Sequence, residues 1–178
     1  MESEIGIPVG VIVERRKSKH PWADYTWTGV AVVPHAPPTD GWQQIMSADD
    51  VTQFQYAPVS VTLHRKMGEA YDANMETGAP SLWILLDDAD TEPVPFAVRA
   101  VTADPYEAQA ALDAGEGLIE RLPMPKDMLL WAVDYLKQMP DPEAFKKRKR
   151  QSSRPEKQQF GKEPIFAQDR RRSEGAGE

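Results

Sequence analysis

Apolar and polar residues alternate in several runs of strand length, and this period of two residues limits the folds open to the chain. The first run is Ile7–Arg15, where every second position up to Val13 is apolar. A second run covers Tyr25–Val33, and a third places Val59, Val61 and Leu63 opposite Ser60, Thr62 and His64. Successive side chains of a strand point to opposite faces, so each run predicts a half-buried β-strand.

Three further segments predict strands of other kinds. "SLWILL", Ser81–Leu86, is almost continuously apolar and indicates a strand in the middle of a sheet. Val94–Val101 alternates again, and "GLIERL", Gly117–Leu122, has the length of one more short strand.

Helix signals fall between and after these strands. Met67–Glu76 has apolar residues at four-residue spacing, and in "DPYEAQAALDAG" Asp104 is placed to cap a helix, with Glu107 completing a capping box and Gly115 ending it. A helix of about four turns is expected between Pro125 and Pro140, with its inward residues at one face. These inward residues are Leu129, Ala132, Val133 and Leu136, with Trp131 and Tyr135 beside them.

The predicted order is β-β-β-α-β-β-α-β-α. Short connections between alternating strands favour an α+β fold, with a mainly antiparallel sheet of about five to six strands and two to three helices on one face. Gly41–Ala57 is ambiguous: Ser47 followed by Asp50 resembles a capping box, but any helix there is short.

Charge divides the chain at Pro140. Residues 1–140 hold 10 lysines and arginines against 21 acidic residues, whereas residues 141–178 hold 11 against 7, giving net charges of −11 and +4. The second part is polar and almost without periodicity, as in segments that cannot form a core. We therefore expect one domain over residues 1–140 and a flexible basic tail with short aromatic islands over residues 141–178.

Several classes of protein are disfavoured. The chain has no cysteine, which excludes disulfides and thiolate chemistry. Nucleotide-binding glycine motifs, the serine-hydrolase elbow and the HExxH zinc motif are all missing. Neither a membrane span nor an export signal is found, so we expect a cytoplasmic protein without a cofactor. His20 and Asp24 lack a third ligand and the other histidines are isolated, so no metal site is expected.

The stretch "ERRKSKHPWADYTW", Glu14–Trp27, gathers two arginines, two lysines, a histidine and three aromatic residues between two predicted strands. A hairpin loop with charged residues near its base explains most of it without a function. The functional alternatives are a contact for a protein partner, in which Arg15, Arg16, Trp22 and Trp27 take part, and a nucleic-acid contact. The acidic domain argues against nucleic acid.

Two other segments carry chemistry-bearing side chains. "FKKRKR", Phe145–Arg150, is a basic run that suits a solvated tail, an acidic protein partner or RNA. His64 and Glu69 sit at a predicted strand–helix corner, where they would form either a general base with its orienting carboxylate or a hydrogen-bonded corner without catalysis.

Several of these segments in this order resemble one bacterial family, the domain of unknown function number 3305. They are "PVGVIVERR" and "HPWADYTW" within Pro8–Trp27, "LHRKMGEAYDAN" from Leu63, "DPYEAQ" from Asp104, "LPMP" from Leu122, and "FKKRKR". The resemblance implies a bacterial cytoplasmic protein encoded beside a molybdenum-dependent formate dehydrogenase and its maturation factors. It assigns no catalytic residue.

The leading hypothesis is therefore a non-catalytic accessory or assembly protein that binds this formate dehydrogenase or a maturation factor. The alternatives are a nucleic-acid-binding protein that uses the tail, and a small-molecule enzyme that uses His64 and Glu69. The residues expected to contact the partner are Arg15, Arg16, Trp22, Trp27, Phe145, Lys146, Lys147, Arg148, Lys149 and Arg150.

Overall fold

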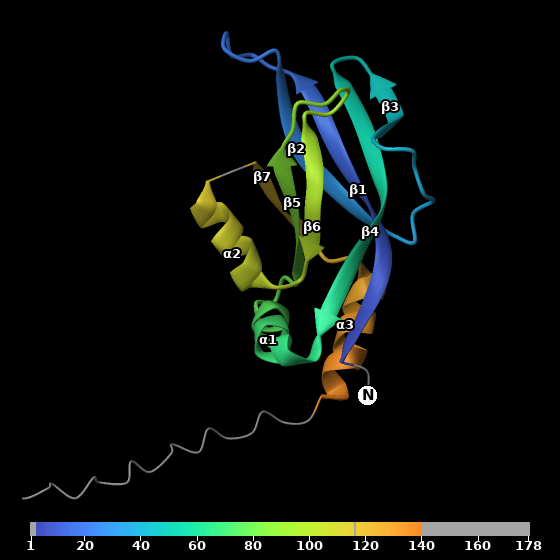
Figure 1. Ribbon diagram of the computed structural model, residues 1–178, viewed down its shortest axis with the longest axis vertical. Coiled ribbons are helices and arrows are strands. Elements are labelled where there is room, and N and C mark those ends of the chain that lie inside the picture. Colours follow the sequence, from blue (N-terminus) through green and yellow to red (C-terminus); the bar gives the residue numbers. More distant parts are fainter. Residues whose placement is uncertain (1–2, 116, 140–178) are drawn as a thin grey trace, which may run out of the picture. The chain divides into compact units, whose positions relative to one another are not determined.

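The computed structural model describes residues 3–115 and 117–139 of the protein (Figure 1). A short 3-10 helix, Arg65–Met67, precedes the first α-helix. The elements are β1 (Glu4–Lys17), β2 (Tyr25–Pro34), β3 (Gln43–Ala48), β4 (Val51–His64), α1 (Gly68–Glu76), β5 (Ser81–Asp88), β6 (Phe96–Thr102), α2 (Pro105–Ala114), β7 (Leu118–Pro123) and α3 (Lys126–Lys137).

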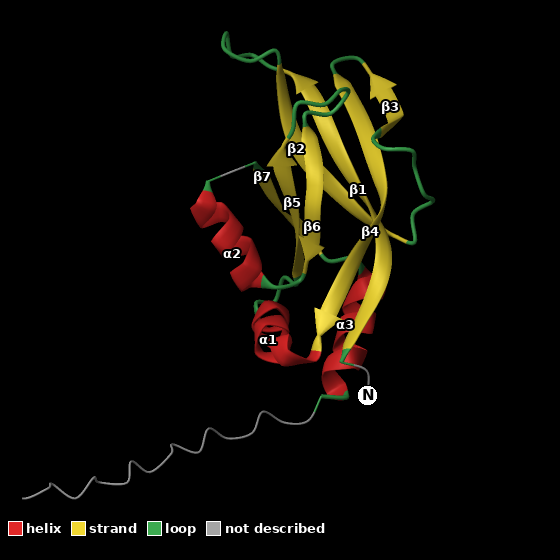
Figure 2. Cartoon of the chain, in the orientation of Figure 1, coloured by secondary structure: helices red, strands yellow, loops and turns green. Residues whose placement is uncertain are grey.

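Two antiparallel sheets form the framework (Figure 2). Sheet A has the strand order β2-β1-β4-β3, and sheet B has the order β6-β5-β7. β4 contacts β6 and β2 contacts β7, so the two sheets lie against each other. The α+β class is confirmed, but the prediction of one sheet of about five to six strands was wrong, because the seven strands among the described residues divide between two sheets.

The main core lies between the sheets and α3. Sheet A contributes the alternating apolar positions that the sequence indicated, and Val9, Val11, Val13, Val61 and Leu63 are fully buried. Full burial of one such side chain stabilises the fold by about 1.5–3 kcal/mol. The alternation of apolar and polar residues therefore correctly predicted which face of sheet A is buried.

β5 is the middle strand of sheet B, as its continuous apolar run predicted. Leu82, Ile84 and Leu86 pack in the main core, whereas Trp83 and Leu85 form a second cluster with alanines of α2 on the other face. Because β5 is buried on both faces, its sequence does not alternate.

α2 begins and ends where the sequence predicted. The Asp104 carboxylate accepts hydrogen bonds from the backbone N–H groups of Tyr106 and Glu107, and Gly115 closes the helix with a φ of 69°. The predicted capping box is incomplete, however, because the Asp104 N–H donates to Thr102 Oγ1 at 3.1 Å and not to Glu107. The Glu107 side chain is therefore not used in the cap.

Gly41–Ala57, which was ambiguous from the sequence, contains β3 and the first part of β4 and no helix. β3 ends at Ala48 and β4 begins at Val51, with Ser47 paired opposite Thr52 in the ladder. Asp49 makes the tight turn with a φ of 49°, a left-handed conformation that aspartate tolerates better than most residues. The Ser47–Asp50 pattern is thus a hairpin signal.

The inward face of α3 is rotated from the predicted one. Met128, Ala132 and Tyr135 are buried, so only Ala132 of the predicted set lies at the centre of that face. Leu129 and Leu136 pack at its margin. The thioether of methionine fills irregular space well, which periodicity alone does not reveal. The predicted tail, residues 141–178, lies outside the described residues, so its disorder and the domain boundary stay predictions.

Candidate binding surface at the β1–β2 hairpin

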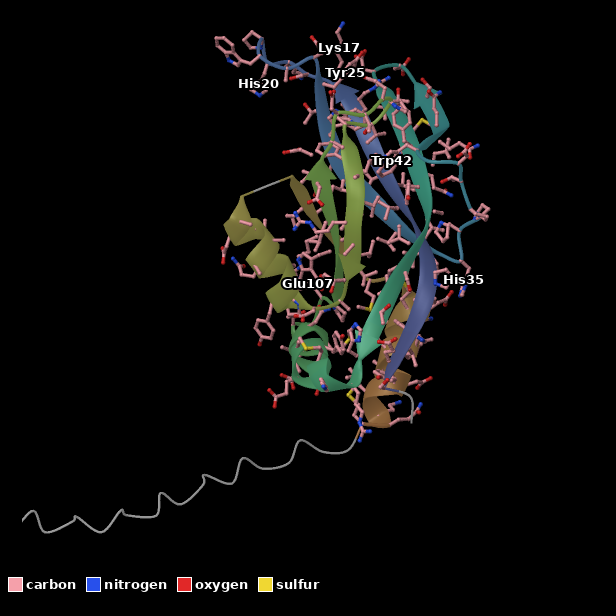
Figure 3. The ribbon with its side chains drawn as sticks, in the orientation of Figure 1. Lys17, His20, Tyr25, His35, Trp42 and Glu107 are labelled. Atoms are coloured by element: carbon pink, nitrogen blue, oxygen red, sulfur yellow. The ribbon has the colours of Figure 1, made fainter. Side chains whose placement is uncertain are left out.

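The stretch Glu14–Trp27 forms the end of the β1–β2 hairpin. Lys17 pairs with Tyr25, and the connecting residues 18–24 extend beyond the sheet (Figures 1 and 3). Within the loop the Ser18 N–H donates to the Asp24 carbonyl at 2.9 Å, and the Ser18 hydroxyl accepts from the His20 N–H at 3.0 Å. The hairpin interpretation is therefore confirmed, and the loop has hydrogen bonds of its own.

Trp22 lies in this loop with 92% of its surface exposed. Aromatic residues of this size normally bury much of their surface, so an exposed tryptophan on a projecting loop is a feature to be explained. Lys17, Lys19 and His20 of the same hairpin are also exposed, and Tyr25 is 47% exposed. We call Trp22, Lys17, Lys19 and His20 the hairpin tip.

Arg15 and Trp27 lie at the base of the same hairpin. The Arg15 guanidinium lies 4.4 Å from the ring centre of Tyr25, 5.5 Å from that of Phe54 and 5.9 Å from that of Trp27. Trp27 is partly buried and packs against Phe54 and Phe96 at ring-centre distances of 5.9 and 6.1 Å. A cation over aromatic faces is attracted by their quadrupoles, so Arg15 stabilises the hairpin.

Arg16 is engaged with a carboxylate. Its Nε–H donates to Glu14 Oε1 at 2.6 Å, while Gln53 Nε2 donates to Glu14 Oε2 at 2.8 Å. The hydrogen bond from Gln53 is the largest cause that lowers the pKa of Glu14, and Arg16 lowers it further, against the opposing effect of burial. The charge of Arg16 is therefore largely neutralised within sheet A.

The structure thus divides the residues that the sequence singled out. Arg15 and Trp27 are brought together at the base, Arg16 is paired with Glu14, and Trp22 stands apart at the tip. Tyr25, which alternation places on the same strand face as Trp27, joins Arg15 and Trp27 at the base although it was not among the predicted contact residues. The predicted contact residues from Phe145 to Arg150 lie outside the described residues.

The predicted His64–Glu69 corner has a different geometry. His64 Nδ1 lies 3.3 Å from Glu4 Oε2, because β1 and β4 place these two residues directly opposite each other. The His64 backbone N–H donates to the Tyr71 hydroxyl at 3.0 Å. His64 therefore takes its carboxylate neighbour from β1, and a hydrogen-bonded corner with Tyr71 describes the segment.

Residues 3–115 and 117–139 contain neither a metal-binding cluster nor a helix that could span a membrane. No group of three or more histidine, aspartate and glutamate side chains in this part of the chain is placed to hold a metal ion. No helix in it is long and apolar enough to cross a membrane.

Comparison with the curated proteins gives no match, and neither does comparison with the solved structures. A family model does match, over residues 8–149, which include most of β1, the strands β2 to β7 and the three α-helices described above. The match begins near the start of β1 and continues through the hairpin and the helices. The chain therefore belongs to the family described as "Protein of unknown function (DUF3305)".

Proposed function

We propose that this protein is a non-catalytic accessory protein that binds another protein through the hairpin tip. The observation that carries the proposal is Trp22, which is 92% exposed on a loop that projects from sheet A. The proposed partner is a molybdenum-dependent formate dehydrogenase or one of its maturation factors. This choice rests on the gene neighbourhood that the family resemblance implies.

The side chains of the hairpin tip suit a protein interface. Tryptophan is enriched among the residues that dominate binding energy, and one ring can bury about 150–250 Å². Lys17, at the end of β1, and Lys19, in the loop, add exposed positive charge to the same hairpin, where charges act mainly on association rate and choice of partner. An acidic surface with an apolar pocket is the matching partner surface.

The base of the hairpin supports such a contact mechanically. Arg15, Tyr25 and Trp27 stack together, and the Lys17 N–H donates to the Asp50 carbonyl of the neighbouring hairpin at 3.2 Å. A loop held at both strands loses less conformational freedom on binding than a free segment. The proposed second contact, Phe145–Arg150, would add avidity through its linkage to the first.

The test is affinity capture with mass spectrometry from the organism that encodes the protein. Three baits are compared: the natural chain, Trp22→Ala, and the matched control Leu130→Ala, which truncates a leucine on α3 that is 56% exposed. We expect the natural chain and Leu130→Ala to recover formate dehydrogenase subunits or a maturation factor. Trp22→Ala should recover about tenfold less, which corresponds to about 1.4 kcal/mol.

Equal recovery by Trp22→Ala and the natural chain would remove the hairpin tip from the interface. Recovery of only ribosomal and RNA-associated proteins by all three baits would overturn the accessory role and favour the nucleic-acid alternative. A fourth bait that ends at Pro140 tests the second contact. If it recovers the same partners as fully as the natural chain does, Phe145–Arg150 makes no contribution.

A further inference from the structure

A cavity of about 440 Å³ lies where the two sheets meet α1 and α2. β4 contributes Ser60, Thr62 and His64, which are alternate residues and so share one face of the strand. Thr102 of β6 and Asp104, the cap of α2, also line it. The volume falls within the range of about 300–1,000 Å³ that is usual for small-ligand sites.

Asp104 gives this cavity a charged acceptor. The residue is only 6% exposed, and its Oδ1 accepts from the Tyr106 and Glu107 N–H groups at 2.8 and 3.4 Å. No donor among the described residues bonds Oδ2. Since no described side-chain polar atom is both fully buried and unpaired, Oδ2 is accessible to solvent, and Asp104 is one of the residues that line the cavity.

Glu107 adds a second carboxylate. It lies on the first turn of α2 (Figure 3) and lines the cavity. A capping box would occupy this side chain with the Asp104 N–H, but Thr102 takes that hydrogen bond instead. The Glu107 carboxylate is therefore available to a ligand.

The Tyr71 hydroxyl lies close enough to Asp104 and Glu107 to be affected by their charges. Burial is the main cause that raises the pKa of its hydroxyl, and the negative charges of Asp104 and Glu107 raise it further. The hydroxyl accepts from the His64 N–H at 3.0 Å. Because the hydroxyl stays neutral, it adds a hydrogen-bonding group to this wall without adding a negative charge.

The remaining walls are apolar. Ala100, Val101 and Met67 complete the lining, and Met67 is 37% exposed at the start of α1. The one basic side chain among the described residues that line the cavity, His64, already lies 3.3 Å from the carboxylate of Glu4. The balance of charge is therefore negative, and an anionic ligand is disfavoured.

We propose that this cavity binds an organic cation, an ammonium group carried on a short aliphatic stem. Asp104 Oδ2, the Glu107 carboxylate and the Ser60 and Thr62 hydroxyls supply the acceptors that its three N–H donors need. The apolar walls bury the stem. Such a group occurs in free diamines and in the lysine side chains of proteins, and both present the same chemistry to the cavity. The site is independent of the proposed function, because it lies away from the hairpin tip.

The test is a ¹⁵N-NMR titration of the full chain with three probes. They are 1,5-diaminopentane, Nα-acetyl-lysine N-methylamide, and the same lysine derivative acetylated at Nε, which has no charge. We expect a charged probe to give saturable shifts at Thr62, His64 and Thr102, with a Kd on the order of 1 mM, as ligand efficiencies for small molecules indicate. The neutral probe should bind at least tenfold more weakly.

Two variants separate this site from general attraction to an acidic protein. Asp104→Asn removes the charge while asparagine keeps the cap, so α2 should remain folded. Asp113→Asn changes the net charge equally on the same helix, but Asp113 does not line the cavity. We expect a loss of affinity of at least tenfold for the first and less than twofold for the second. Circular dichroism checks that both variants are folded.

Each other outcome overturns the inference. Equal losses in the two variants would show non-specific attraction, and equal binding of the neutral probe would show that charge is not recognised. The absence of saturable shifts with either charged probe would leave no cation site. Between the two sources, binding of the diamine alone indicates a free amine, and comparable binding of both charged probes indicates recognition of the ammonium group itself. Binding of the lysine derivative alone indicates a lysine within a polypeptide.

Discussion

The tip and the base of the β1–β2 hairpin differ in what their tryptophans do, although Trp22 and Trp27 are five positions apart. Trp27 lies on β2, is partly buried against the main core, and packs its ring against Phe54 and Phe96. Trp22 lies in the loop, with 92% of its surface exposed. Within one segment, therefore, the base is structural, and the exposed tip is the part to which the proposed binding role is assigned.

The same division holds for the basic residues. Arg15 and Arg16 belong to β1. The Arg15 guanidinium stacks on aromatic rings, and Arg16 forms an ion pair with Glu14. Lys17 ends the strand and Lys19 lies in the loop, both exposed. A strand residue meets neighbours on both adjacent strands, whereas a loop residue beyond the sheet meets few. Composition alone does not separate these cases, but position along the hairpin does.

The largest expected effect is the loss of stability in Trp27→Ala. Truncation of a buried aromatic ring costs about 3–5 kcal/mol, and the partial exposure of Trp27 places it near the lower end, at about 3 kcal/mol. The variant also removes one ring from the Arg15 stack. Urea unfolding followed by circular dichroism measures the change, with Trp22→Ala as the matched substitution. A loss below about 1 kcal/mol would mean that the base is not held by this ring.

A smaller effect is expected for Glu14→Gln, which tests how the base holds Arg16. The variant keeps the shape of the side chain but removes a charge that accepts two hydrogen bonds. Hydrogen bonds to charged groups are worth about 1.5–3 kcal/mol, and an exposed partner such as Arg16 lowers this to about 1 kcal/mol.

The pH dependence of this difference follows from the lowered pKa of Glu14. A carboxyl group whose pKa is lower in the folded state stabilises the fold above its unfolded value of 4.5, and this contribution is lost as the pH falls through the folded value. The natural chain should therefore be more stable than Glu14→Gln at pH 7, with the gap closing as the pH falls below 4.5 through the lowered pKa of Glu14. A gap that stays constant over this range would contradict the assignment to the Glu14 charge.

The strands and helices were largely predictable because their signals are local. Alternation marks β1, β2 and part of β4, and Asp104 with Gly115 marks both ends of α2. β3 was missed because it is an edge strand whose residues are mostly exposed. Its sequence, "QQIMSA", therefore shows no alternation of apolar and polar residues. The division into two sheets was missed because periodicity does not say which strands pair.

The candidate sites depend more strongly on long-range pairing. Glu4 meets His64 only through the β1–β4 register, across 60 positions of sequence, so the local alternative Glu69 was the natural choice. The cavity likewise is lined by residues of β4, β6, α1 and α2, so no single segment of the sequence could have predicted it. The hairpin tip was predictable as a loop, but the exposure of Trp22 required the structure.

The smallest expected effect on stability is that of Trp22→Ala. The contrast with Trp27→Ala tests whether the tip and the base of the hairpin have different roles. A side chain that is 92% exposed contributes almost nothing to the core, so the free energy of unfolding should change by less than about 0.5 kcal/mol. The urea midpoint and slope should both match those of the natural chain. Together with about tenfold weaker partner capture, this would separate recognition from folding within one hairpin. A destabilisation comparable to that of Trp27→Ala would instead make the tip part of the structural base.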